Sequence, residues 1–213
     1  MLSQMRVHEL LEKTASKEPV PGGGSISALA AAAAASLVEM VANLTLGRKG
    51  FEDVSGEMEY ISRKATQYRE RLTTAIDQDS EAYAKVMEAF RMPKSEEREK
   101  QKRSAAIQKA LRGAAEVPLA VAEDALSLLQ LAKSVVKKGN PNAVTDGLVA
   151  VMMARTGALG AIQNVRINLD SLKDQAYVSK LGAHVREMER DVMRIEKEIL
   201  ADSQTYDAVS FGI

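Results

Sequence analysis

Residues 21–25 read Pro-Gly-Gly-Gly-Ser and lead directly into a very alanine-rich apolar segment, Ile26 to Leu46. Pro21 fixes φ and therefore ends any helix before it, while Ser25 is a favourable N-cap for the segment that follows. The glycines permit left-handed turns and close approach of another group to the backbone. This stretch predicts a chain break followed by a long helix with little side-chain bulk.

The same glycine run is a candidate ligand site. A helix N-terminus presents free N–H groups and the positive end of the helix dipole, which suit an anion or a carbonyl group. A plain turn between two helices is the alternative reading of Gly22, Gly23 and Gly24.

Composition restricts the class of protein. The 213 residues are 46% hydrophobic and 27% charged, with a formal net charge of +0 and no cysteine. No overall basic field attracts nucleic acid or an anionic membrane, and disulfides and thiolate chemistry are excluded. Because the first 17 residues lack an apolar core, no signal peptide is expected. We expect a cytoplasmic protein.

The pattern of the whole chain is all-α, with helix formers throughout and no alternating strand pattern. We expect a single domain over 1–213, a bundle of about six helices with buried Ala-rich central helices. Pro118 should kink or split the fourth helix, and Asn140 with Pro141 should open the fifth. The expected helices cover Ser3–Lys17, Ile26–Leu46, Ser55–Met92, Ser95–Lys138, a segment from Asn140 and Ser171–Ser203.

Two of these helices are long and apolar enough to raise the question of a membrane span. The first contains Glu39 and Asn43, and the segment Ala143 to Val165 contains Asp146 and Arg155. Both are better explained as central helices covered by other helices, so no membrane partner is expected.

The last helix carries a one-sided apolar stripe with 4-3-4-3-4 spacing, which packs on a bundle or on a second subunit. Together with the nearly all-apolar central helices, it suggests a homodimer. The stripe consists of Leu181, Val185, Met188, Val192, Ile195 and Ile199.

Asp79 is out of place in the third helix. It lies in the apolar seam between Ala75 and Tyr83, where a carboxylate is costly unless it is paired or hydrogen-bonded. Burial would raise its pKa toward neutrality, which suits a general acid or base. A buried ion pair, or a bond to another helix terminus, is the structural alternative. Asp77 falls off the seam and is expected in solvent.

Arg155 is a second misfit, inside the apolar stripe of the fifth helix. A planar cation there suits a carboxylate, either of a ligand or of Asp79, and an internal structural pair is equally compatible. Ser36, Glu39 and Asn43 form a thin polar stripe on the second helix that faces either solvent or a pocket. The two histidines lie far apart without a neighbouring ligand, so no metal site is expected.

Several short stretches, in this order, resemble the cyclodeaminase domain of formiminotransferase-cyclodeaminase and its stand-alone relatives, the methenyltetrahydrofolate cyclohydrolases. Each is weak alone, and the ordered set spans Pro21 to Leu169. The matching stretches are Pro21 to Ser25, Glu39-Met40-Val41, Asn43-Leu44-Thr45, Lys49, Asp79 with Ala82-Tyr83, Gly139 to Asn142, Thr145-Asp146, Asn164-Val165 and Ile167-Asn168.

The resemblance implies an all-helical homodimer that binds a reduced folate beside the glycine loop, and it assigns the catalytic acidic position to Asp79. It implies either hydrolysis of 5,10-methenyltetrahydrofolate or ring closure of 5-formiminotetrahydrofolate with loss of ammonia, with no metal or other cofactor. A non-catalytic folate-binding protein and a helical scaffold are the competing classes. The expected substrate-binding residues are Gly22, Gly23, Gly24, Ser25, Glu39, Lys49, Asn140, Asn142, Asp146, Arg155 and Asn164.

Overall fold

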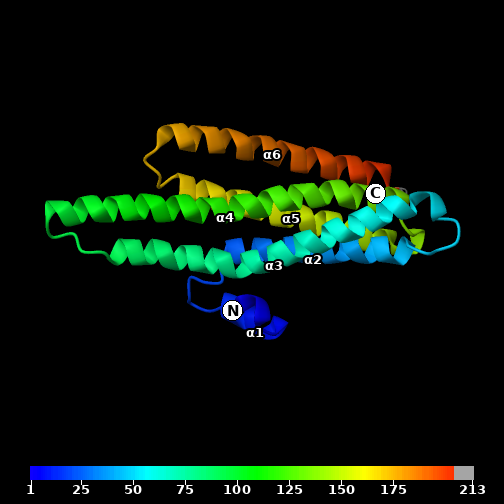
Figure 1. Ribbon diagram of the computed structural model, residues 1–213, viewed down its shortest axis with the longest axis horizontal. Coiled ribbons are helices and arrows are strands. Elements are labelled where there is room, and N and C mark those ends of the chain that lie inside the picture. The colour runs from blue at the N-terminus through cyan, green and yellow to red at the C-terminus, as the bar shows by residue number, and fades with distance from the viewer. Residues whose placement is uncertain (204–213) are drawn as a thin grey trace, which may run out of the picture.

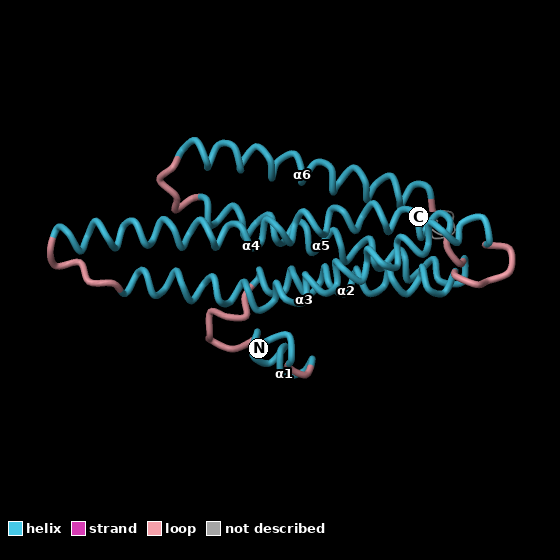
Figure 2. Tube along the Cα trace, in the orientation of Figure 1, coloured by secondary structure: helices cyan, strands magenta, loops and turns pink. Residues whose placement is uncertain are grey.

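The computed structural model describes residues 1–203, and in that range every regular element is helical (Figures 1 and 2). The all-α prediction is confirmed. The elements are η1 (Leu2–Gln4), α1 (Val7–Thr14), α2 (Gly23–Thr45), η2 (Glu52–Val54), α3 (Ser55–Arg91), α4 (Glu97–Lys138), η3 (Pro141–Ala143), α5 (Val144–Leu169) and α6 (Gln175–Asp202).

The Ala-rich α2 packs against α3 and α5 and also contacts α4. Small residues let the backbones approach closely: a β-carbon on Gly157 of α5 would lie 2.8 Å from the Ala31 side chain of α2. Helix α2 and the segment Pro141–Leu169 are long and apolar enough to span a membrane by length and hydropathy, and 61% and 50% of their most apolar windows are buried by neighbouring helices. Packing within the bundle therefore accounts for much of their apolar character.

Helices α3 and α4 are the longest and pack side by side. Both extend beyond the N-terminal end of α2 (Figure 1). The start of α2 lies beside Asp79, whereas α3 continues to Arg91. Helix α4 runs without interruption through Pro118, so the alternative of a split helix is wrong, and a kink at Pro118 stays a prediction.

Helix α6 packs on α4 and α5 and covers one side of the bundle (Figure 1). Its six predicted stripe residues are all buried, so the stripe faces the chain's own core. The helix starts at Gln175, four residues later than predicted, because the Asp174 side chain caps it by accepting from the Tyr177 N–H.

The N-terminal segment is anchored by Asp77, whose expected solvent position is wrong. The Asp77 side chain is 8% exposed and accepts hydrogen bonds from the Leu2 and Ser3 N–H groups and from the Ser3 hydroxyl. The predicted first helix is consequently shorter than expected: a 3-10 turn bound to Asp77, followed by the separate helix α1.

Candidate functional site

Helix α2 begins earlier than its sequence suggests. Its N-cap is Gly22 and its first helical residue is Gly23, which places Ser25 inside the first turn rather than at the cap. None of the three glycines has a positive φ, in contrast to Gly47 and Gly50 in the connector after α2. The glycines at the start of α2 are therefore not needed for left-handed backbone.

Gly24 is explained by close approach of α3. A β-carbon on Gly24 would lie 2.6 Å from the carboxyl carbon of Asp79 and closer still to its Oδ1. Real β-carbons do not come so near another group, so a side chain at position 24 would displace this carboxylate from its place. The absent side chain lets the carboxylate of α3 lie on the first turn of α2.

Ser25 holds the other carboxylate oxygen. Its Oγ is fully buried, 2.9 Å from Asp79 Oδ2 and 3.0 Å from the carbonyl oxygen of Ile76. A second hydroxyl, that of Ser80, lies 3.4 Å away. The Ser25 backbone N–H also bonds Asp79. The N-terminus of α2, predicted to bind a ligand's anion, is thus occupied by the protein's own carboxylate.

Burial raises the pKa of Asp79 above its ordinary value of 3.8, and the hydrogen bonds from the Ser25 side chain and backbone oppose the rise without cancelling it. No cation offsets this burial, since Asp79 forms no ion pair among residues 1–203. A carboxyl group whose pKa moves toward neutrality is suited to take up and release a proton.

The Ser25 hydroxyl can serve both protonation states of Asp79. A hydroxyl has one donor hydrogen and two acceptor positions. When Asp79 is ionised, Ser25 donates to Oδ2. When Asp79 is protonated, its O–H can donate to Ser25 Oγ, and Ser25 then donates to the Ile76 carbonyl oxygen. Neither state leaves the Ser25 hydroxyl without a partner.

Asn164 of α5 lies at the same end of the bundle. Its Nδ2 would be 3.4 Å from a β-carbon on Gly23, and it donates to the Gly160 carbonyl oxygen at 2.9 Å. The structure thus brings together the predicted residues Gly23, Gly24, Ser25, Asp79 and Asn164, supplied by α2, α3 and α5.

A second group of predicted residues lies at the opposite end of α2. Asn140 is buried, and its backbone N–H donates to Thr45 Oγ1 at 2.9 Å. Its side chain donates to the Leu44 carbonyl oxygen and caps η3 by accepting from the Asn142 N–H. From Ser25 to Thr45, α2 rises by about 30 Å. The expectation of one pocket holding both groups is therefore wrong for a single copy of the chain.

Asp146 in the first turn of α5 and the exposed Lys49 belong to this second end. Lys49 follows Gly47 in the connector that leaves α2, and its side chain makes no ion pair among residues 1–203. Neither residue can reach Asp79 within the same copy of the chain.

Glu39 and Arg155, two charged residues that were predicted to bind substrate, each form an ion pair with a residue of another helix. Glu39 accepts from the Thr66 hydroxyl and from Arg69 Nε, both at 2.9 Å, and this pairing raises the pKa of Arg69. Arg155 Nε lies 2.6 Å from a Glu196 carboxylate oxygen on α6. The predicted pairing of Arg155 with Asp79 is wrong, and the structural alternative holds.

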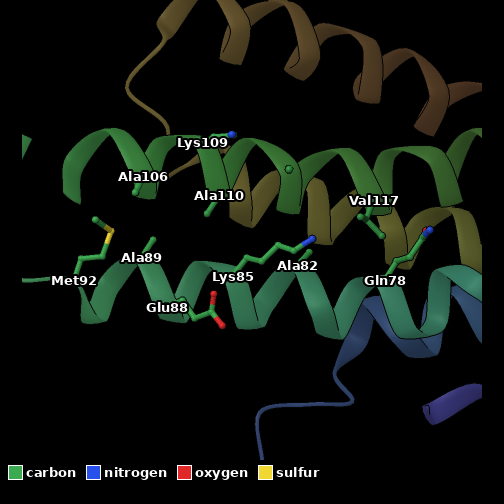
Figure 3. A pocket seen from close by; sticks show the side chains of 11 residues that line it. Gln78, Ala82, Lys85, Glu88, Ala89, Met92, Ala106, Lys109, Ala110 and Val117 are labelled. Carbon is green, nitrogen blue, oxygen red and sulfur yellow. The ribbon is translucent and has the colours of Figure 1, made fainter. Parts of the chain in front are cut away.

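A groove next to Asp79 was not predicted. It lies between α3 and α4, has a volume of about 580 Å³, and begins at Gln78 and Ala82, one residue before and three residues after Asp79 (Figure 3). Small apolar residues make most of its wall, and Lys85 and Lys109 add two cations. The sequence signal was available, because Ala82, Lys85 and Ala89 recur at helical spacing on one side of α3.

Among residues 1–203, the structure contains no group of three or more His, Cys, Asp or Glu side chains that could hold a metal ion. That the reaction needs no cofactor stays a prediction.

Comparisons with known proteins agree on one family. The Formiminotransferase-cyclodeaminase profile matches residues 6–187. A methenyltetrahydrofolate cyclohydrolase of Methylorubrum extorquens is 38% identical over 180 residues, covering 84% of this chain and 86% of that protein. The formimidoyltransferase-cyclodeaminase of Mus musculus is 33% identical, and the match covers 80% of this chain but 31% of that protein.

The crystal structure of formiminotetrahydrofolate cyclodeaminase from Thermotoga maritima has the same fold, with a TM-score of 0.84 and 30% identity over 93% of this chain and 96% of that one. The family profile spans both the glycine start of α2 and Asp79, which form the site described above. The chain therefore belongs to the formiminotransferase-cyclodeaminase family.

Proposed function

We propose that this protein is a methenyltetrahydrofolate cyclohydrolase, which adds water to 5,10-methenyltetrahydrofolate and opens it to 10-formyltetrahydrofolate. The observation that carries the proposal is the half-buried Asp79 carboxylate, which lies against Gly24 and accepts a hydrogen bond from Ser25. The cyclohydrolase of Methylorubrum extorquens, similar over most of both chains, supports this choice of reaction.

The mechanism follows from the position of the carboxylate. Asp79 in its ionised form takes a proton from the water that attacks the methenyl carbon, which gives a tetrahedral adduct bridging N5 and N10. It then returns this proton to N5 as the bond between N5 and that carbon breaks, and the adduct hydroxyl loses its proton to solvent. The Ser25 hydroxyl stays hydrogen-bonded to Asp79 in both its ionised and its protonated state, because it can also donate to the Ile76 carbonyl oxygen.

The electrostatics support this role. Methenyltetrahydrofolate carries a delocalised positive charge across N5, the bridging carbon and N10, and an ionised Asp79 would attract it. Binding of that cation would in turn favour the ionised, basic form of Asp79. The attack neutralises the cation while Asp79 takes up the proton that the attacking water loses, so the ion pair of carboxylate and cation becomes a neutral acid beside a neutral adduct.

The test is the loss of near-ultraviolet absorbance of 5,10-methenyltetrahydrofolate with purified protein, compared with its uncatalysed rate. Asp79→Asn should lower turnover by roughly 10²–10⁴, and Asp77→Asn serves as the matched control on the same helix. Near-normal turnover in Asp79→Asn refutes the role of Asp79, and no acceleration by the wild-type protein refutes the cyclohydrolase.

Formiminotetrahydrofolate cyclodeaminase is the second candidate, favoured by the name of the Thermotoga maritima structure. That reaction passes through a similar tetrahedral carbon and requires Asp79 to protonate departing ammonia. Release of ammonia from 5-formiminotetrahydrofolate, without accelerated loss of the methenyl compound, would select it. Tight binding of both folates without turnover would select the non-catalytic binding protein.

A homodimer is part of the proposal. The outer faces of α2 and α5 leave Met40, Leu44, Val149 and Met152 between 36% and 50% exposed, although α2 is otherwise an apolar core helix. A second copy covering this face would bury them. Light scattering on eluted protein should give twice the chain mass, and a stable monomer at micromolar concentration refutes the dimer.

An antiparallel dimer would also give a role to the second group of predicted residues. Two copies packed antiparallel along α2 would set the Gly24 end of one helix beside the Thr45 end of the other. Asn142 and Asp146 would then contribute to a folate site that Asp79 of the other copy serves. Mixing Asp79→Asn protein with Asp146→Asn protein, after subunit exchange, should restore activity that neither has alone. No recovery after verified exchange refutes the shared site.

A further inference from the structure

We propose that Asn168 of α5 is a positioning residue of the site at Asp79: it fastens α5 to α4 and thereby holds the Asn164 side chain beside the start of α2. This inference rests on the proposed function and extends it to a residue beyond the contact of α2 with α3. It also gives a role to Asn168, which lies in one of the family-like stretches of the sequence and is not used by the mechanism above.

The carbonyl oxygen of Ala114 in α4 needs a donor from outside its own helix. In an α-helix such an oxygen accepts from the N–H of the residue four positions later, which here is Pro118 and has no N–H. Helix α4 continues through this position, and both residues are buried, where an unpaired carbonyl is costly. The Asn168 side chain supplies the missing hydrogen bond, because its Nδ2 donates to the Ala114 oxygen at 3.0 Å.

The second hydrogen of the same amide group is used within α5. Nδ2 of Asn168 also donates to the carbonyl oxygen of Asn164, one helical turn earlier, at 2.8 Å. A side-chain NH₂ group has two donor hydrogens, so both have an acceptor here. Because a backbone carbonyl can only accept, the nitrogen of Asn168 must face both oxygens, and the side chain cannot turn over without losing both bonds.

The part of α4 that Asn168 holds is a wall of the groove beside Asp79. Gly113 and Val117, which flank Ala114 in the sequence, both line this groove (Figure 3). Asn168 therefore fixes the position of this wall relative to α5.

Helix α5 is in turn closely seated on the start of α2. A β-carbon on Gly160 would lie 3.3 Å from the Ser27 β-carbon, and the next contact along the two helices places Asn164 Nδ2 3.4 Å from a β-carbon on Gly23. The helices leave little space between them here. A shift of α5 along its contact with α4 would therefore move the Asn164 side chain relative to the first turn of α2.

The amide of Asn164 has one end that is fixed and one that is free. Its Nδ2 donates to the Gly160 carbonyl oxygen at 2.9 Å, which turns Oδ1 away from that carbonyl. Among residues 1–203, no protein group donates to Oδ1, and the atom is not buried. An accessible amide oxygen beside Gly23 can accept a hydrogen bond from a substrate N–H or from the attacking water. Asn168 acts on the reaction by holding this oxygen in place.

The pairing of Asn168 with Pro118 is tested by thermal unfolding of single and double variants. Asn168→Ala leaves the Ala114 carbonyl without a donor and should lower Tm by about 3–8 °C. In the Pro118→Ala background an N–H is available within α4, so the same change should lower Tm by less than about 2 °C. Asn168→Asp, which has the same size but no donor for either carbonyl, should be at least as damaging as Asn168→Ala. Equal losses in both backgrounds, or a harmless Asn168→Asp, overturn this pairing.

The positioning role is tested by kinetics at a temperature well below the lowest Tm. Asn164→Ala and Asn168→Ala should each lower kcat/KM for 5,10-methenyltetrahydrofolate by about tenfold, as expected for a displacement of less than 1 Å. If Asn168 acts through Asn164, the double variant should be within about twofold of Asn164→Ala alone. A purely structural Asn168 would lower Tm and leave kcat/KM unchanged. That result, or losses that multiply in the double variant, overturns the positioning role.

Gln108→Ala is the matched control. The Gln108 side chain also joins α4 to the chain just after α5, because its Nε2 donates to the Ser171 carbonyl oxygen at 3.2 Å, but it does not contact Asn164. This variant should keep kcat/KM within about twofold of the wild-type value. A tenfold loss in Gln108→Ala would mean that any loosening of this end of the bundle lowers activity, and it would overturn the specific role of Asn168.

Failure of the proposed reaction gives a different result from failure of this inference. If the wild-type protein binds 5,10-methenyltetrahydrofolate without accelerating its loss, the cyclohydrolase is refuted, and the same cycle is measured as Kd. Asn168→Ala should then weaken binding about threefold in the wild-type background and not in Asn164→Ala. Normal hydrolysis by the wild-type protein together with an unchanged kcat/KM in Asn168→Ala overturns the inference and leaves the proposed reaction standing. If no folate binds at all, the role of Asn168 at the site is overturned, even where the unfolding experiment confirms its pairing with Pro118.

Discussion

The carboxylate of Asp79 lies where a side chain on Gly24 would have to be, with its carboxyl carbon 2.6 Å from the position of a β-carbon. The two residues come from different helices and are separated by more than fifty positions in the chain. The glycine loop and the misplaced acid, two separate anomalies in the sequence, are therefore one structural feature.

Gly24→Ala should move the carboxylate of Asp79 and lower kcat/KM by about 10²-fold, because a displacement near 1 Å at a reacting group has an effect of this size. Gly56→Ala is the matched control, since a β-carbon there meets nothing within 4 Å. The control should retain full activity. Steady-state kinetics on both variants check this, and an active Gly24→Ala protein contradicts the contact.

Ser25→Ala removes a hydrogen bond that favours the ionised form of Asp79, so the pKa of Asp79 should rise further. The acidic limb of the kcat/KM profile should then move to higher pH. Ser27→Ala is the control on the same helix, because the Ser27 hydroxyl donates to the Gly23 carbonyl oxygen and does not contact Asp79. An unmoved limb in Ser25→Ala, or an equal shift in both variants, contradicts this role.

The raised pKa of Asp79 also predicts the sign of a stability change. Since the folded state holds this proton more tightly than the unfolded chain, protonation stabilises the fold. This stabilisation is fully present below pH 3.8, the ordinary pKa of the group in the unfolded chain. It is lost as the pH rises through the higher pKa that Asp79 has in the folded protein. Asp79→Asn remains neutral, so its free energy of unfolding should exceed that of the wild-type protein at neutral pH.

Urea unfolding of both proteins between pH 3.5 and about pH 8 measures this difference, because titration of all other groups cancels between them. The gap in the free energy of unfolding should close toward the acidic limit. A less stable Asp79→Asn protein at neutral pH would mean that the charge on Asp79 stabilises the start of α2 more than its burial costs.

The sequence was sufficient for the helices and for Asp79, because both depend on local periodicity. Apolar residues at helical spacing predicted α3 and α6, and a carboxylate within the α3 seam was visible as a break in that pattern. The partner of Asp79 was not visible, since contact between α2 and α3 depends on how the helices pack. The cap of α2 was misassigned to Ser25 for the same reason: its hydroxyl is used by α3.

The predicted site residues lie at two opposite ends of α2, and their order along the sequence does not predict this separation. Residues Asn140 to Asp146 follow Asp79 in the chain, but α4 carries the chain back along the bundle before α5 begins. Asn140 is consequently fixed to Thr45, at the far end of α2 from Asp79. Sequence spacing gives no measure of distance across antiparallel helices.

Arg155→Gln tests whether this arginine is structural. Arg155 Nε lies 2.6 Å from the Glu196 carboxylate, whose side chain is 16% exposed, and a mostly buried carboxylate that loses its partner costs about 1–3 kcal/mol. We expect a loss of that size in the free energy of unfolding, with kcat and KM unchanged. Arg194→Gln, which removes two exposed ion pairs within α6, should cost less than about 1 kcal/mol.

The double variant Arg155→Gln/Glu196→Gln should recover part of the lost stability, because the charge that remained unpaired is also removed. A ligand-binding arginine would behave differently. It would leave the free energy of unfolding nearly unchanged and raise KM for the folate, and replacing Glu196 would not compensate. Because α6 carries Glu196 and lies across α5 from the start of α2, we expect Arg155→Gln to lower the free energy of unfolding. A raised KM with unchanged stability would instead place Arg155 in the substrate site.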